Sequence, residues 1–138
     1  MEATNGMEMK HYILKGHEII ETDWLTWARW VEQIDERRVA RTERGKIVVS
    51  TVFLGLDHNW VSEGPPVLFE TMIFGSQRLS EYQRRYCTWD EANTGHERAV
   101  KMVHFTDVIW ETFPALPTPD WSWKHTIKYL IRGTLATN

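Results

Sequence analysis

The chain lacks the means to form an internal disulfide, because Cys87 is the only cysteine among its 138 residues. A lone thiol is typical of a protein made in a reducing compartment. No apolar run approaches the roughly 20 residues that a helix needs to cross a bilayer, so no membrane partner is expected. Residues 1–10 lack the basic and apolar stretches of a signal peptide. Together these absences predict a cytoplasmic protein.

Neither sign of charge dominates, since 16 Lys and Arg against 19 Asp and Glu give a net charge of −3. A nucleic-acid partner is therefore not expected, because proteins that bind nucleic acids usually carry a basic surface. The sequence has no phosphate-binding glycine loop, no dinucleotide fingerprint and no nucleophile elbow. It also lacks the His and Cys spacing of a metal site. We therefore predict no cofactor and no metal.

Tryptophan is the one residue type in excess, with eight copies. Large amphipathic rings are enriched at partner surfaces and in ligand pockets, although many simply line the edges of a core. Trp30 lies off the apolar face of its predicted helix, which makes it a candidate for an exposed contact.

Two apolar segments, 46–57 and 67–74, are predicted to be the central strands of a sheet, because both are rich in β-branched and aromatic residues. Alternation along 46–57 leaves both faces of that strand apolar. In a sheet with one face exposed to solvent, the exposed face would be polar. The second face is therefore predicted to be covered by helices or by another subunit.

The N-terminal part of the domain combines a hairpin with a helix. Segments 11–14 and 17–20 are predicted to pair through a turn at Gly16, with a single bulged strand as the alternative. Residues 23–36 are predicted to form one helix, capped by Thr22 or Asp23. Its apolar face comprises Trp24, Trp27, Ala28, Val31 and Ile34.

A basic segment, 37–42, is predicted to be an edge strand that pairs with 46–57 through a turn at 43–45. Residues 76–85 are polar and indicate a loop or a poorly packed turn of helix. A capping box formed by Thr88 and Glu91 starts a long helix that Pro114 ends. Its apolar stripe comprises Ala92, His96, Ala99, Val100 and Val103.

These elements predict an α+β fold: a mixed or mainly antiparallel sheet of four to five strands with two to three helices packed on it. Residues 1–10 are expected to form a flexible arm and 11–113 a single domain. Residues 114–138 are expected to add a Pro-rich connector and a C-terminal helix packed on that domain.

The best catalytic candidates are Asp57, His58, Glu70 and His96. Asp57 and His58 follow the first central strand, and an antiparallel partner strand would bring Glu70 near them. His96 is on the helix stripe that faces the sheet, where it could approach Glu70. A carboxylate among apolar side chains is suited to general acid–base chemistry when it is unpaired. The alternative is a structural Glu70 bonded to Arg98 or to Trp89.

Arg41, Trp60 and Trp89 are the candidate ligand-binding residues. Arg41 belongs to a local basic patch on the predicted hairpin, in which alternate arginines could clamp the phosphates of a nucleotide. The tryptophans could stack on the base of the same nucleotide. The alternative is a solvated sheet edge that discourages aggregation. The patch comprises Arg37, Arg38, Arg41, Arg44 and Lys46.

Several segments taken together resemble a group of small uncharacterised proteins encoded by tailed bacteriophages and prophages. The matching segments are 11–17, 39–42, VSTVFLGLDH at 49–58, GPPVLFETMIFG at 64–75, and YCTWDEA at 86–92 with Gly95 and His96. The resemblance covers about residues 11–103 and implies a viral protein in the cytoplasm of a bacterial host. It implies no activity, ligand or catalytic residue.

Three functions are consistent with these features. The leading hypothesis is a phage accessory protein that binds a host protein or a small, nucleotide-like ligand, as a homo-oligomer. Excess tryptophan, two apolar sheet faces and the lack of a complete catalytic motif favour it. The second is a small hydrolase that uses Asp57, His58, Glu70 and His96. The third is a minor virion or assembly component.

Overall fold

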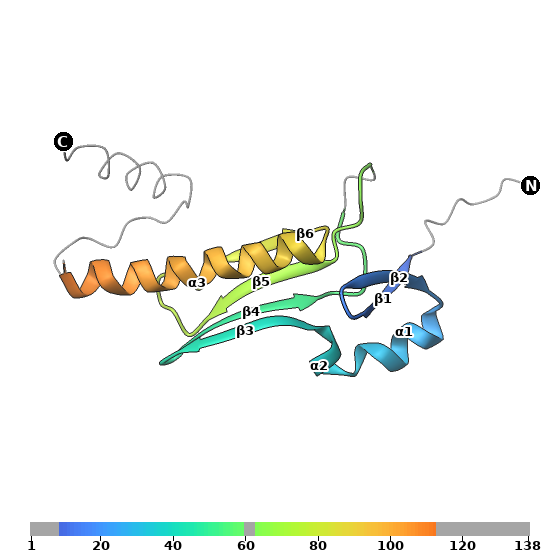
Figure 1. Cartoon of the computed structure of the whole chain (residues 1–138), viewed down its shortest axis with the longest axis horizontal. Helices are drawn as coiled ribbons and strands as arrows, with labels where there is room; N and C mark the ends of the chain where they lie inside the picture. Colours follow the sequence, from blue (N-terminus) through green and yellow to red (C-terminus); the bar gives the residue numbers. More distant parts are fainter. Residues whose placement is uncertain (1–8, 60–62, 113–138) are drawn as a thin grey trace, which may run out of the picture. The chain divides into compact units, whose positions relative to one another are not determined.

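A computed structural model describes residues 9–59 and 63–112 of the chain, with side chains up to Thr106 (Figure 1). It has the predicted α+β fold, with three helices and two antiparallel sheets among these residues. In chain order the elements are β1 (His11–Lys15), β2 (Glu18–Thr22), α1 (Trp24–Val31), α2 (Ile34–Arg37), β3 (Arg38–Arg44), β4 (Ile47–Phe53), β5 (Phe69–Phe74), β6 (Gln83–Tyr86) and α3 (Trp89–Thr112).

The hairpin of β1 and β2 forms as predicted, and the bulged single strand is wrong. Gly16 takes φ = 61° in the turn, a conformation that costs a residue with a Cβ atom much more. The strands pair from His11 with Thr22 to Lys15 with Glu18. The amide of Tyr12 also donates to the carbonyl of Gly55 over 2.9 Å. That bond attaches the hairpin to the segment that leaves β4.

The second sheet has the strand order β3-β4-β5-β6, entirely antiparallel. The two apolar segments are its central strands, and the basic strand lies at an edge, as the sequence predicted. Strand β6 corrects the prediction of a loop or helical turn over 76–85. Three of its four residues are polar and only Tyr86 is aromatic, so the segment carries no apolar period, and its pairing with β5 makes it a strand.

Helix α3 covers one face of this sheet. The predicted capping box is present: the amide of Glu91 donates to Thr88 Oγ1 over 3.2 Å, and Glu91 Oε2 accepts from the amide of Thr88 over 3.2 Å. Of the predicted stripe, Ala92, His96, Ala99 and Val103 are buried, and Val100 is partly buried against the same cluster. Ala99 and Val103 pack with Val49 and Ile73 on the sheet in one hydrophobic cluster.

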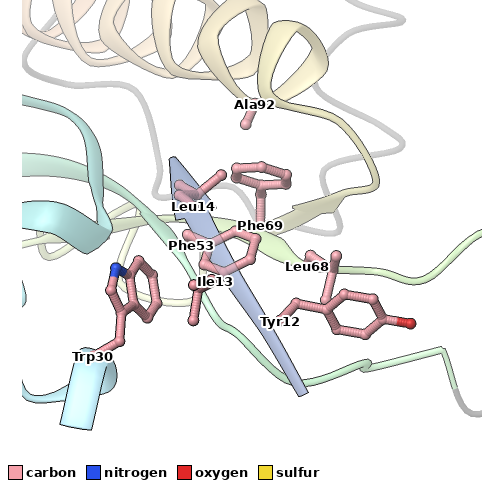
Figure 2. Packing of buried hydrophobic residues seen from close by; sticks show 8 residues of the cluster. All are labelled: Tyr12, Ile13, Leu14, Trp30, Phe53, Leu68, Phe69 and Ala92. Atoms are coloured by element: carbon pink, nitrogen blue, oxygen red, sulfur yellow. The ribbon is translucent and has the colours of Figure 1, made fainter. Parts of the chain in front are cut away.

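A second hydrophobic cluster joins the hairpin, α1 and the sheet (Figure 2). Phe53 lies at its centre, with its ring 5.5 Å from that of Trp30 and 5.1 Å from that of Phe69, edge-on in both cases. Tyr12, Ile13 and Leu14 of β1, Leu68 before β5 and Ala92 of α3 complete the cluster.

The single helix predicted over 23–36 is wrong, because α1 ends at Val31 and α2 is a separate short helix. Gln33 leaves the helical region with ψ = 84°. The carbonyl of Val31 accepts instead from Arg37 Nη1 over 3.3 Å, while Arg37 Nε donates to the carbonyl of Phe53 over 3.1 Å. Arg37 therefore ties the end of α1 to the end of β4.

The predicted apolar face of this region is also shifted. Asp23 caps α1 as expected, accepting from the amide of Thr26 over 3.0 Å. Trp24 and Ile34, predicted to face the core, are 62% and 68% exposed. Trp30, predicted to be an exposed contact, is buried against Phe53. The helix packs through Trp27, Trp30 and Val31, which contact the cluster around Phe53.

The chain divides into two compact units, 1–105 and 106–138. The first contains both sheets, α1, α2 and α3 as far as Phe105. The described residues of the second, 106–112, are helical. The predicted connector and C-terminal helix over 114–138 lie outside the described residues, as does most of the predicted arm over 1–10.

Candidate functional site

Asp57 and His58 brace the loop between β4 and β5. One carboxylate oxygen of Asp57 accepts from the amide of Asn59 over 2.8 Å and from the amide of Val67 over 2.9 Å. His58 Nδ1 donates to the carbonyl of Leu56 over 2.8 Å. Because Asp57 accepts from backbone amides at both ends of the loop, its role here is to hold the loop closed.

Glu70 lies on the face of β5 that points away from α3. Its Oε2 accepts from Gln83 Nε2 over 2.6 Å and from Arg85 Nε over 2.8 Å. The side chain of Glu70 is only 11% exposed. Glu70 is therefore a structural residue, as the alternative interpretation predicted. Its partners are on β6, so the predicted partners Arg98 and Trp89 are wrong. The alternation of Gln83 and Arg85 was the sequence signal for it, since alternate residues of a strand share a face.

His96, a residue of α3, points toward the sheet and forms a buried polar cluster with three threonines. Its Nε2 is 2.9 Å from Thr42 Oγ1, and its Nδ1 is 2.8 Å from Thr51 Oγ1, which in turn is 2.6 Å from Thr71 Oγ1. Burial lowers the pKa of His96, with Glu97 acting in the opposite direction. A neutral ring suits this site, because hydroxyl groups can both donate to it and accept from it.

The four catalytic candidates do not converge on one site. Thr71 faces His96, so its neighbour Glu70 points to the opposite face of the sheet. His96 approaches the sheet as predicted, but the predicted approach to Glu70 is wrong. With the carboxylate and the imidazole on opposite faces, the arrangement offers no shared acid–base site.

The ligand-binding candidates are separated in the same way. Arg41 on β3 is opposite Ser50 and so lies on the face away from α3, where its Nε and Nη2 donate to Glu43 Oε1 over 2.9 and 2.5 Å. Trp89 begins α3, and its ring stacks on His17 with centroids 3.5 Å apart and planes inclined by 14°. Trp60 lies outside the described residues.

The arginines of the basic patch all have partners within the protein. Arg37 is the internal tie described above, and burial lowers the pKa of its guanidinium. Arg38 pairs with Asp35 at 3.1 Å, and Arg44 contacts His104 of α3. With these partners the arginines are not arranged to clamp a phosphate together.

Cys87 offers little nucleophilic reactivity. Burial, with nearby Glu91 and Asp57, raises the pKa of its thiol. Thiolate is the reactive form of cysteine, so a raised pKa makes the side chain less reactive at neutral pH.

The face of the sheet away from α3 is the strongest candidate surface. The open face, as we call it, consists of Val48, Ser50 and Val52 of β4 with Met72 and Phe74 of β5. Val48 is paired with Phe74 and Ser50 with Met72, whereas Val52 is paired with Glu70. Phe74 is 49% exposed and the other four are partly exposed. None of these five belongs to either hydrophobic cluster or packs against one.

Ion pairs flank the open face on both sides. Arg41 and Glu43 lie beside it on β3, and Glu70 and Arg85 lie at its other end across β5 and β6. The sequence predicted part of this surface, because it showed that the second face of 46–57 is apolar. It did not show that Phe74 is exposed. An apolar patch of this kind on a folded domain is typical of an interaction site.

Over residues 9–59 and 63–112, no three His, Cys, Asp or Glu side chains are grouped so that they could hold a metal ion. No helix in the same part of the chain is both long and apolar enough to cross a membrane. Comparison of the chain with protein-family models, with curated proteins and with solved structures found no match.

Proposed function

We propose that this protein is an accessory protein of a tailed bacteriophage that works by binding a protein partner through the open face. The observation that carries the proposal is the half-exposed Phe74 beside Met72, Val48 and Val52, on a sheet face that contributes to neither hydrophobic cluster. Apolar surface left in water costs free energy that a partner would recover by covering it. The resemblance to phage proteins supports the viral context and a bacterial cytoplasm.

A protein partner fits this surface better than a small ligand. The open face belongs to a sheet, and the three arginines at its border are already paired, Arg41 with Glu43, Arg85 with Glu70 and Arg38 with Asp35. A nucleotide would have to break one of those ion pairs to gain a phosphate contact. A flat apolar centre with a charged rim is instead the usual composition of a protein–protein contact.

Site-specific photo-crosslinking tests the proposal. Phe74 is replaced by p-benzoylphenylalanine in the full chain, which is produced in bacterial cells and irradiated. Phe105, a 44% exposed residue of α3, carries the same group in the control. We expect a discrete protein adduct from position 74, identified by mass spectrometry, that position 105 does not give. No adduct at 74, or the same adducts at both positions, would contradict the proposal.

A role as a minor virion or assembly component would use the same surface inside a particle. Co-purification of the protein with phage particles, in fixed proportion to a capsid protein, would favour that role over an accessory one.

A further inference from the structure

We infer that the partner of the open face is a second copy of this chain, so that two four-stranded sheets pack face to face about a two-fold axis. The inference rests on the proposed function, since it names the partner of the same surface. In such a contact the same patch is used on both subunits, and Phe74 of each copy is covered by the other.

The charges around the open face favour an identical partner. Arg41 is neutralised by Glu43, and Arg85 by Glu70, within one copy of the chain. Because each flank carries one acid and one base, two copies can meet without like charges being forced together. A partner of strong positive or negative charge would gain no comparable attraction from this surface.

The size of the face predicts a weak dimer. Strands about 20 Å long, spaced about 4.8 Å apart across four strands, give a footprint of about 400 Å² for each copy. A standard interface buries about 800 Å² for each partner and a stable one at least about 500 Å², so this contact has the size of a weak, transient association. We therefore expect a dimer that dissociates on dilution to about 1 µM and forms at about 100 µM.

The polar residue at the centre of the face is compatible with this contact. Ser50 lies between Val48 and Val52, opposite Met72. Its hydroxyl can bond to the same hydroxyl of the second copy, because it can both donate and accept. A charged side chain in that position would have opposed a symmetric contact.

Sedimentation velocity of the purified full chain at about 2 to about 200 µM tests the inference. The wild type should change from monomer to dimer over this range. Phe74→Asp should weaken the association at least about tenfold, because two carboxylates would be buried in the contact. Phe105→Asp, at the similarly exposed position on α3, should leave it unchanged.

Met72→Lys provides a second disrupting variant in case Phe74→Asp perturbs folding, which circular dichroism would reveal. A wild-type monomer at every concentration would overturn the inference, as would a dimer that persists in folded forms of both variants. Monomeric protein that still gives a different protein as the adduct at position 74 would retain the proposed function and reject the second copy. Absence of any adduct would reject both.

Discussion

Arg85 on β6 holds the carboxylate of Glu70 on β5, with 2.8 Å between Nε and Oε2, and the two residues are directly paired across the strands. Glu70 is buried, whereas the side chain of Arg85 is 37% exposed. Together with the bond from Gln83 to the same carboxylate, the pair attaches the polar residues of β6 to β5. It also removes a charge from the border of the open face.

Replacing Arg85 should destabilise the protein. Arg85→Met leaves the buried carboxylate of Glu70 without its cation, so we expect the free energy of unfolding to fall by about 1–2 kcal/mol in urea denaturation. Arg98→Met, an exposed change on α3, should stay within about 0.5 kcal/mol of the wild type. Replacing both partners, as Glu70→Met with Arg85→Met, should restore part of the loss. Equal effects of Arg85→Met and Arg98→Met would contradict the role of the pair.

Stability should depend on pH through His96. Its pKa is lower in the folded protein than in the unfolded chain, because burial disfavours the charged ring. The unfolded chain therefore binds the proton more readily, so stability is full above the ordinary pKa of about 6.5 and is lost as pH falls below it.

The measurement is the urea midpoint at about pH 8 and about pH 5 for the wild type and for His96→Gln. The wild type should lose more stability between the two pH values than His96→Gln, whose amide does not titrate in this range. His17→Gln, which removes a histidine from the exposed turn of the hairpin, is the matched control. If His96→Gln shows an equal pH dependence, His96 is not its source.

Arg37 and Arg38 are adjacent in the sequence but should differ in their contribution to stability. Arg37 donates to the carbonyls of Phe53 and Val31, so Arg37→Met should cost about 1–3 kcal/mol by leaving both without that donor. Arg38 forms a surface pair with Asp35, and Arg38→Met should cost about 0.5 kcal/mol or less. Thermal and urea unfolding of the two variants would measure the difference. Equal losses would show that Arg37 does not tie α1 to β4.

Gly95 should not tolerate alanine. In an exposed helix this change stabilises by about 1 kcal/mol, but here a Cβ atom would lie within 3 Å of the Tyr86 ring. We expect Gly95→Ala to destabilise by about 1–3 kcal/mol through this overlap. The Tyr86→Leu variant should remove most of the effect, which a double-mutant cycle would record. The neighbouring exposed change, Thr94→Ala, serves as the control, and additive effects of Gly95→Ala and Tyr86→Leu would contradict the contact.

Local patterns were sufficient for most of the fold. The β-branched and aromatic residues of 46–57 and 67–74, the turn glycine Gly16 and the capping box of Thr88 and Glu91 are each local features, so each can be read from neighbouring sequence. The buried stripe from Ala92 to Val103 could be read for the same reason. These features also located the apolar second face of β4 that became the candidate surface.

The tertiary structure decided which residues meet. Glu70 contacts Arg85 and Gln83 because β6 pairs with β5. The sequence did not predict β6, because a short, mostly polar strand has no apolar period. Trp30 is buried because it packs edge-on against Phe53 of β4, whereas Trp24 on the same helix is exposed; these contacts lie between residues far apart in the sequence. His96 and Glu70 are separated by the thickness of the sheet because strand pairing, and not the spacing of acidic and imidazole groups along the chain, determines the face on which each side chain lies.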